Sequence, residues 1–398
     1  MDFETISSYK TPGRRNSILL IISWLVGALF IFSGLIKMND PLGFSYKLEE
    51  FFEVFHITFL SPLAVSIAVV LCAAEIILGA ALILGIKGAK VAAGLLITII
   101  FFSFLTFYAA YFDVVKTCGC FGDAIKLSPW QSFGKDVVLL ILILYIFYKR
   151  KEIRPLIISE KAQSRALWII TVLAFGFGFY TYNYLPVKDF LPYNIGANIP
   201  ENMKIPEGAP VDEYKIMYNL VNKKTGEAKQ MTDKEYMKTE IWKDSNWEIK
   251  GEPERELIKK GFEPKIKDLK ISDSQGTDYT TELIENPYYN LVIVAYNLDA
   301  MNKQAIGDLN ALAMNAGENY NIRTVLLTAS SPSTAEAFQK KNKLAMEVFY
   351  ADAVPLKSMV RSNPGILLLK DGVVINKWHY HTRPSYQQLE EKYFRSKE

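Results

Sequence analysis

Two of the three cysteines of the 398-residue chain stand one residue apart, in the segment Cys118-Gly119-Cys120-Phe121-Gly122-Asp123. Two residues separate their Cα atoms by at most about 7 Å, so a disulfide between these cysteines closes a small ring that departs from relaxed geometry. Strained, exposed disulfides are the ones that are easily reduced. The spacing therefore indicates either a pair that cycles between dithiol and disulfide, or a static disulfide or two unpaired thiols in a loop.

Five apolar segments in the first half of the chain are each long enough to cross roughly 30 Å of hydrocarbon as a helix. Three of them carry no charge, the second contains Glu75, and the fourth contains Lys135 and Asp136 near its start. The sequence thus predicts a membrane domain with transmembrane helices over residues 17–36, 61–86, 91–112, 128–148 and 166–185.

Basic residues flank these segments at alternate ends, which orients the domain because such residues stay in the cytoplasm. They precede the first segment and lie between the second and third and between the fourth and fifth: Lys10, Arg14, Arg15, Lys87, Lys90, Lys149, Arg150, Lys151, Arg154, Lys161 and Arg165. The first segment is too long for a signal peptide and lacks a small-residue cleavage site. We therefore expect a cytoplasmic N-terminus in a bacterial inner membrane, with the Cys118 loop and everything after residue 185 on the extracytoplasmic side, where disulfides persist.

Three motifs of the membrane half resemble a known family. They are FSGLIKMNDP at residues 32–41, AEIILG at 74–79 and the Cys-Gly-Cys-Phe-Gly-Asp loop. Together they resemble the DoxX-like superfamily, and within it most closely the methylamine-utilisation MauE family, over roughly residues 15 to 150. The resemblance implies a four-helix bundle, here followed by a cytoplasmic loop and fifth helix at 151–185. It also implies a role in disulfide formation in extracytoplasmic proteins, with Cys118 and Cys120 as the redox pair and Glu75 and Lys37 as matching polar positions.

The polar residues near the thiols suggest a proton path. A carboxylate within a membrane helix is costly and normally faces the bundle interior, so Glu75 is either a proton relay for the thiols or a protonated carboxyl that bonds a neighbouring helix. Lys37 is expected to snorkel or to pair with Asp40. As an anion, Asp123 would disfavour a neighbouring thiolate.

Other side chains of the membrane half have simpler interpretations. Cys72 is interpreted as a packing residue. Residues 48–59 form an amphipathic stretch that predicts an interfacial helix, where His56 is a lone surface histidine or a neighbour of the thiols.

A linker from the membrane is predicted over residues 186–260, because five prolines fall near its start. Within it, residues 214–221 and 227–232 flank Asn-Lys-Lys-Thr-Gly, which indicates a β-hairpin. The segment around Trp242 and Trp247 has no pattern that we can assign.

From residue 261 onward, strand and helix patterns alternate, which indicates a layered α/β domain. Strands are expected at 266–272 and 278–283 as a hairpin, then at 290–296, 324–328, 347–350, 365–369 and 373–378, with helices at 303–320 and 332–342. Residues 262–266 (FEPKI), 291–296 and 362–372 (SNPGILLLKDG) resemble a TlpA-type thioredoxin-like domain over residues 261–398. The resemblance implies a cis-proline at Pro364 that, with Asn363, shapes a peptide-binding groove.

The expected redox motif of that family is missing. Where the family carries Cys-x-x-Cys, this chain reads Asn-Leu-Asp-Ala-Met-Asn-Lys at 297–303, and no cysteine follows Cys120. This domain therefore either binds an extended client near Pro364 or acts as a spacer toward another envelope protein.

Two functions remain open for this mixed α-helical and α/β chain. One is a membrane thiol–disulfide oxidoreductase for extracytoplasmic clients, for which a membrane quinone is a possible electron acceptor although no motif indicates one. The other is a membrane-anchored scaffold of an envelope complex with a structural Cys118–Cys120 bond. A net charge of +3 without a basic, aromatic-interleaved patch does not favour nucleic acid as a partner. The neighbouring His379 and His381 are too few for a metal site.

Overall fold

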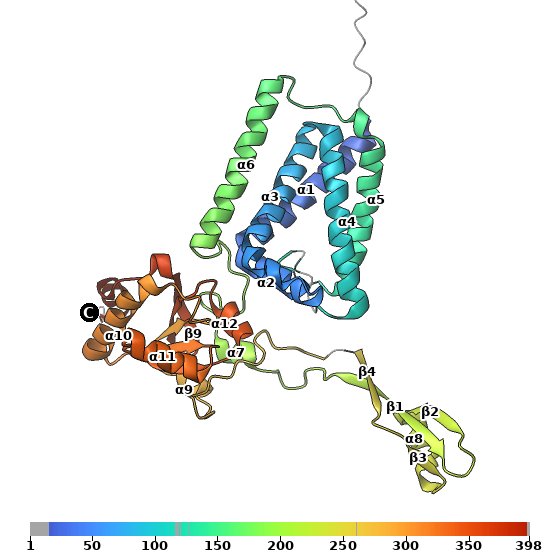
Figure 1. Ribbon diagram of the computed structural model, residues 1–398, viewed down its shortest axis with the longest axis vertical. Coiled ribbons are helices and arrows are strands. Elements are labelled where there is room, and N and C mark those ends of the chain that lie inside the picture. Colours follow the sequence, from blue (N-terminus) through green and yellow to red (C-terminus); the bar gives the residue numbers. More distant parts are fainter. Residues whose placement is uncertain (1–15, 116–118, 120, 126, 260, 396–398) are drawn as a thin grey trace, which may run out of the picture.

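Five long apolar helices form the first half of the protein in the computed structural model, which describes residues 16–115, 119, 121–125, 127–259 and 261–395. Each is long and apolar enough to cross a membrane, as the sequence predicts. They are α1 (Ser17–Asn39), α3 (Ala64–Leu84, extended at its start by the 3-10 turn Thr58–Leu63), α4 (Gly88–Phe112), α5 (Pro129–Tyr148) and α6 (Glu160–Asn183). Helix α6 stands at one side of the other four (Figure 1).

Helices α1 and α3 cross in direct backbone contact, because glycines stand at the crossing. A Cβ atom on Gly34 would lie 2.8 Å from the carbonyl oxygen of Cys72, and one on Gly79 would lie 2.6 Å from the carbonyl oxygen of Gly27. Small residues at such crossings are the usual means of close helix packing in membranes. At the same crossing, a Cβ atom on Gly34 would lie 3.1 Å from the Cβ atom of Glu75.

Helix α2 (Pro41–Val54) lies across the end of the bundle that faces the C-terminal domain (Figure 1). A helix is present in the stretch predicted at 48–59, but it begins earlier, because Asp40 accepts a hydrogen bond from Gly43 N at 2.8 Å and Pro41 occupies the first turn. It ends before His56, whose φ of 56° places it in the left-handed region. The buried residues of α2 are Pro41, Phe44, Ser45, Leu48, Phe51 and Phe52.

The C-terminal domain is built on a five-stranded mixed sheet of order β7-β6-β5-β8-β9. The strands are β5 (Tyr289–Val294), β6 (Arg323–Thr328), β7 (Glu347–Tyr350), β8 (Gly365–Lys370) and β9 (Val373–His379). Strands β5, β6 and β7 are parallel, whereas β8 and β9 are antiparallel to their neighbours. The helices are α10 (Ile306–Tyr320), α11 (Pro332–Asn342), α12 (Ala353–Met359) and α13 (Tyr386–Leu389).

One predicted hairpin of this domain is wrong. Instead of two paired strands at 266–272 and 278–283, the structure has a single bridge between Ser272 and Asp278, followed by helix α9 (Thr280–Ile284). Asp278 accepts hydrogen bonds from both the backbone N–H and the hydroxyl of Thr280, and this local bonding favours a turn over an extended strand.

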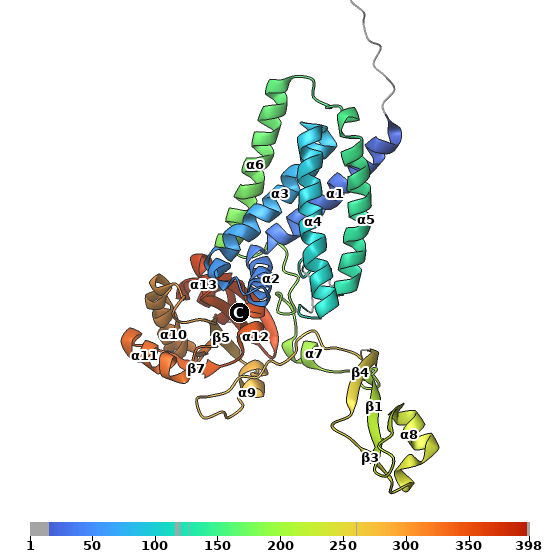
Figure 2. The same ribbon diagram turned by 45° about the vertical axis from the view of Figure 1, so that its right-hand side comes forward.

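The region expected as a linker has two parts. Residues 190–203, with helix α7 (Ile199–Met203), belong to the core of the C-terminal domain, where Tyr193 and Ile199 are buried. Residues 213–259 form a separate four-stranded module that projects away from both domains (Figures 1 and 2). Its elements are the predicted hairpin β1 (Glu213–Asn222) and β2 (Ala228–Thr232), then α8 (Asp233–Thr239), β3 (Trp247–Ile249) and β4 (Glu254–Lys259).

Candidate functional site

The predicted redox pair, Cys118 and Cys120, lies outside the described residues, but its neighbours are described. Gly119 has a φ of 65° and lies against α2, since a Cβ atom there would be 3.3 Å from Cγ of Lys47. Gly122, with a φ of 52°, lies beside Ile36 near the end of α1. Both glycines adopt a left-handed conformation that other residues rarely take.

Phe121 links this loop to the bundle interior. Its ring centroid is 5.6 Å from that of Phe32 on α1, and the Nζ atom of Lys135 lies 5.4 Å from the centre of its ring. Phe121 also lines a hollow of about 50 Å³ among α1, α3, α4 and α5. Phe121 thus places one residue of the cysteine loop at the wall of this hollow.

Glu75 and Lys37 form an ion pair inside the bundle, with side chains 3% and 2% exposed. The expected pairing of Lys37 with Asp40 is therefore wrong. The close crossing at Gly34 places Lys37, one turn further along α1, against Glu75 on α3. The Nζ atom of Lys37 also lies 4.5 Å from the ring centre of Phe102. Oε2 of Glu75 has no hydrogen-bond partner among the described residues, so one carboxylate oxygen remains able to accept a proton or a water.

A second buried acid lines the same hollow. Asp136 is 1% exposed, accepts a hydrogen bond from the hydroxyl of Thr106 at 2.9 Å, and pairs with Lys135. A hollow of about 50 Å³ can hold water, since one water needs roughly 10–15 Å³ of such volume. Two acids and two lysines therefore surround a space that can be hydrated.

Arg361 joins the C-terminal domain to the membrane domain. Its guanidinium, 6% exposed, donates to Asp40 at 2.7 Å and to Asp123 of the cysteine loop at 3.2 Å. Burial alone would lower the pKa of Arg361, but Asp40 and Asp123 hold it above its usual value. Sequence reasoning missed Arg361, because its partners stand 321 and 238 residues away and no local pattern links them.

Two tyrosines lie beside this junction. The hydroxyls of Tyr46 on α2 and Tyr296 at the end of β5 are 3.1 Å apart, and the Nζ atom of Lys357 lies 4.2 Å above the ring of Tyr46. Burial raises the pKa of Tyr46 well above its usual value, and the neighbouring Tyr296 raises it further. Both phenols therefore stay protonated at physiological pH and hold the two domains together through neutral hydrogen bonding.

The predicted groove residues lie further inside the C-terminal domain. The Asn363–Pro364 peptide bond is cis, as expected, and Pro364 is buried. The side-chain amide of Asn363 donates to the carbonyl oxygen of Asn297 at 2.7 Å, and its own carbonyl accepts from Asn302 N at 3.0 Å. Asn363 therefore contacts the segment that stands where a Cys-x-x-Cys motif is missing.

A cleft of about 630 Å³ separates α2 and the cysteine loop from the C-terminal domain. Gly119, Gly122 and Asp123 line it from the loop. The α2 side supplies several carboxylates and the opposite side several cations: Asp40, Glu49, Glu50 and Glu53 face Lys265, Lys267, Lys357 and Arg361. Burial raises the pKa of Glu49. The volume lies within the roughly 300–1,000 Å³ that is typical of ligand sites.

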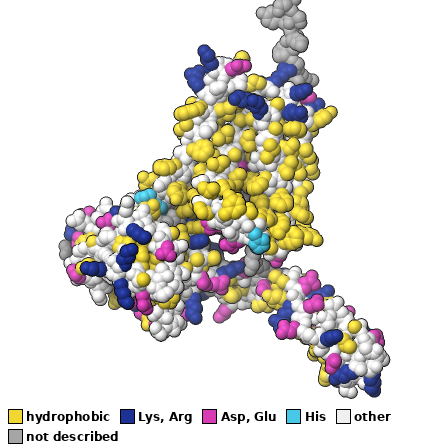
Figure 3. Space-filling view, in the orientation of Figure 1, with side chains coloured by type: hydrophobic (Ala, Val, Ile, Leu, Met, Phe, Trp, Pro, Cys, Tyr) yellow, Lys and Arg dark blue, Asp and Glu magenta, His cyan; other side chains and the backbone are white. Residues whose placement is uncertain are grey.

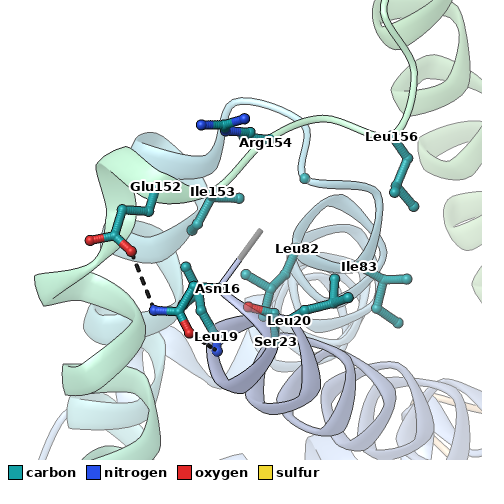
Figure 4. A pocket seen from close by; sticks show the side chains of 11 residues that line it. Asn16, Leu19, Leu20, Ser23, Leu82, Ile83, Glu152, Ile153, Arg154 and Leu156 are labelled. Carbon is teal, nitrogen blue, oxygen red and sulfur yellow. Dashed lines mark hydrogen bonds between the residues drawn. The ribbon is translucent and has the colours of Figure 1, made fainter. Parts of the chain in front are cut away.

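Another hollow lies at the opposite end of the bundle, between α1, α3 and the loop before α6 (Figure 4). It measures about 40 Å³, and the side-chain amide of Asn16 donates to Glu152 at its rim at 3.3 Å. Over the described part of the chain, no group of three or more His, Cys, Asp or Glu is arranged to hold a metal ion. The cleft and the hollow near Glu75 are therefore the stronger candidates for chemistry.

Comparison with known families decides the nature of the first half. Residues 15–149 match the model of the family described as methylamine utilisation protein MauE. These residues form a MauE family domain. The match covers α1 to α5. Helix α6, the projecting module at 213–259 and the C-terminal domain therefore lie outside the MauE domain. No curated protein and no solved structure matches the chain.

Proposed function

We propose that this membrane protein carries out thiol–disulfide exchange on extracytoplasmic client proteins through Cys118 and Cys120. The observation that supports the proposal most directly is that Gly119, Gly122 and Asp123 line the cleft between the MauE domain and the C-terminal domain. We propose that the thiols carried by the same loop react with a client segment that enters this cleft.

In the proposed exchange, electrons and protons pass only between the Cys118–Cys120 pair and the client cysteines. A thiolate of the pair attacks a client disulfide, one client sulfur leaves as a thiolate, and the second thiol of the pair resolves the mixed disulfide. The client disulfide gains two electrons and two protons, and the pair becomes the disulfide. The reverse sequence oxidises a client dithiol. Glu75 is the proposed proton relay for these steps, because its Oε2 has no hydrogen-bond partner among the described residues and it lines the same hollow as Phe121 of the loop.

We propose that the membrane domain is DoxX-like and lies in a bacterial inner membrane with its N-terminus in the cytoplasm. The space-filling view supports this orientation, because lysines and arginines gather at the end of the bundle away from the C-terminal domain (Figure 3). This arrangement follows the positive-inside rule and leaves the cleft on the extracytoplasmic side.

The C-terminal domain is proposed to be a TlpA-type thioredoxin-like domain that binds clients without thiols of its own. Its strand order, with three parallel strands followed by an antiparallel pair, supports this assignment. The client is proposed to contact the cleft wall near Arg361, which is close in sequence to Asn363 and Pro364. Extracytoplasmic proteins, rather than nucleic acid, are the proposed partners.

Net oxidation of the pair requires an electron acceptor, and a membrane quinone is the acceptor class considered from the sequence. The hollow beside Glu75, at about 50 Å³, is smaller than typical organic-ligand sites, so its residues do not fit a quinone ring and we assign no electron step to one. A non-enzymatic scaffold is the alternative function, favoured by the lack of any cysteine after Cys120.

The redox state of the pair in membranes tests the proposal. Cells that express the full chain with Cys72→Ser would be quenched with acid, and free thiols labelled with a mass-tagged maleimide, with and without prior reduction. We expect a mixture of dithiol and disulfide forms that shifts when oxidant or reductant is added. A pair that never changes state, together with full cellular activity of a Cys118→Ser/Cys120→Ser variant, would favour the scaffold.

Trapping identifies the client. In a Cys120→Ser variant, a mixed disulfide through Cys118 is expected to accumulate and to disappear on reduction. The matched control is Cys72→Ser, because Cys72 is fully buried and is expected to leave trapping unchanged. Identical adducts in a variant that lacks both Cys118 and Cys120 would show that the adducts are nonspecific.

A further inference from the structure

We propose that Arg361 is a positioning residue for the cysteine loop, holding the turn at 121–123 against the MauE domain and neutralising the charge of Asp123. The inference deepens the function proposed above and rests on it only for the redox role of the thiols. It assigns to the C-terminal domain, which has no cysteine, a direct effect on the chemistry of the loop.

Three parts of the chain meet at Arg361. Its Nε atom donates to Oδ2 of Asp40 at the α1–α2 corner at 2.7 Å, and its NH2 group donates to Oδ2 of Asp123 at 3.2 Å. Its NH1 group donates to the carbonyl oxygen of Lys357, one turn earlier in α12. Arg361 itself follows the end of α12 by two residues, so its guanidinium is anchored on the last turn of that helix and reaches two carboxylates with its remaining donors. A lysine ammonium cannot do this with the same planar geometry.

The guanidinium is buried, whereas its partners are less so: the side chain of Asp40 is 17% exposed and that of Asp123 is 40% exposed. The Arg361 side chain is 6% exposed, and the guanidinium carbon lies 5.4 Å from the ring centre of Tyr46. A Cβ atom on Gly43 would lie 2.8 Å from NH2 of Arg361, so the absence of a side chain at Gly43 leaves room for the guanidinium. A surface ion pair of this kind would contribute little, but a buried one is sensitive to the loss of either partner.

The charge of Asp123 links Arg361 to the reactivity of the thiols. Asp123 is three residues from Cys120, and an uncompensated carboxylate near a thiol disfavours the thiolate that exchange requires. Of the nearby lysines, Lys47 pairs with Glu50 and Lys135 pairs with Asp136. Lys265, Lys267 and Lys357 line the cleft from the C-terminal domain, but Arg361 is the cation that is bonded to Asp123. Glu49 and Glu53 of α2 line the same cleft and add negative charge. Loss of Arg361 therefore leaves the surroundings of the loop more negative.

The experiment measures how fast the reduced thiols react with iodoacetamide from pH 6 to 10. It uses the full-length protein in detergent, with Cys72→Ser as the background. In Arg361→Gln we expect the midpoint of the rate profile to move upward, so that the rate at pH 7.5 falls roughly threefold or more, as a shift of half a pH unit requires. Arg361→Lys is expected to retain most of the wild-type midpoint, because it keeps the charge.

A charge-balanced double variant separates electrostatics from simple loss of structure. Arg361→Gln/Asp123→Asn is expected to return the midpoint toward the wild type, whereas a merely structural role of Arg361 would leave the double variant as altered as the single one. Asp123→Asn alone, which keeps Arg361, is expected to lower the midpoint of the rate profile. This variant tests the inference if Arg361→Gln fails to fold. The matched control is Arg383→Gln, which breaks the Arg383–Asp308 pair within the C-terminal domain.

An unchanged midpoint in Arg361→Gln, or a double variant that is not restored, would overturn the inference. The experiments separate this inference from the proposed function. Redox trapping in cells tests whether the wild-type pair cycles at all, whereas the rate profile is measured on reduced protein and needs no client.

Discussion

A carboxylate buried between membrane helices needs a cation beside it, and Lys37 provides one for Glu75. Asp40, three residues further along the chain, is bound instead by Arg361 from the C-terminal domain. Sequence alone identified Glu75 and Lys37 as candidates because charges within apolar runs are conspicuous. It could not identify their partners, since Arg361 has an ordinary surface-like sequence context and becomes buried only when the two domains meet.

Breaking the Lys37–Glu75 pair is expected to destabilise the membrane domain strongly. Glu75→Gln removes the carboxylate that pairs with the buried ammonium of Lys37, and breaking a buried ion pair from one side costs about 3–5 kcal/mol. The double variant Lys37→Met/Glu75→Leu, which removes both charges, is expected to lose less than either single change. Thermal unfolding in detergent measures the effect. The control is Glu50→Gln, which breaks the exposed Lys47–Glu50 pair and should cost under about 1 kcal/mol. Equal stability of Glu75→Gln and Glu50→Gln would contradict this expectation.

Elements with a strong periodic pattern were predictable, and elements that depend on distant packing were not. The five apolar helices, the hairpin β1–β2 and the buried strand β5 follow directly from hydropathy and turn residues. Strand β4 escaped prediction because all six of its residues are exposed and no alternation marks it. Likewise, the segment at 278–283 alternates as a strand does, but side-chain bonding by Asp278 turns it into helix α9.

The close crossing of α1 and α3 gives a prediction at this scale. Gly34→Ala adds a Cβ atom 2.7 Å from Ile76 and 2.8 Å from the carbonyl oxygen of Cys72, so the helices must separate and the Lys37–Glu75 contact must loosen. We expect a loss of about 1–3 kcal/mol, as for other overpacked sites. The matched control is Gly134→Ala in α5, where a Cβ atom meets nothing within 4 Å, and which should be neutral or slightly stabilising. Comparing their unfolding midpoints in detergent tests the crossing, and equal midpoints would contradict it.

At the scale of the whole molecule, the candidate site is the cleft between two domains that come from separate parts of the sequence. The MauE domain supplies the cysteine loop and the α2 wall of the cleft, and the C-terminal domain supplies Arg361 and the opposite wall. Each domain was predictable in outline from its own residues. The cleft was not, because its walls come from segments that share no local pattern and their contact is decided by how the folded domains fit together.

The projecting module at 213–259 is expected to be removable without unfolding the rest. The chain leaves and re-enters the body at one point, where Phe262 N donates to the carbonyl oxygen of Pro210 at 2.7 Å and Gly261 N donates to the side chain of Asp212 at 2.7 Å. Both hydrophobic cores of the C-terminal domain are built from residues outside the module. Chain ends that lie this close tolerate excision of the intervening unit.

The test replaces residues 213–259 with a short Gly-Ser linker in the full-length protein. We expect the unfolding midpoint of the remaining protein in detergent to stay within a few degrees of the wild type, and the redox cycling of Cys118 and Cys120 to persist. The point variant Leu220→Asp is the companion control, because Leu220 is 2% exposed in the module and its loss should unfold only β1 to β4. A large fall in the midpoint of the excised protein would show that the module supports the body. Loss of cycling at an unchanged midpoint would instead assign client recognition to the module.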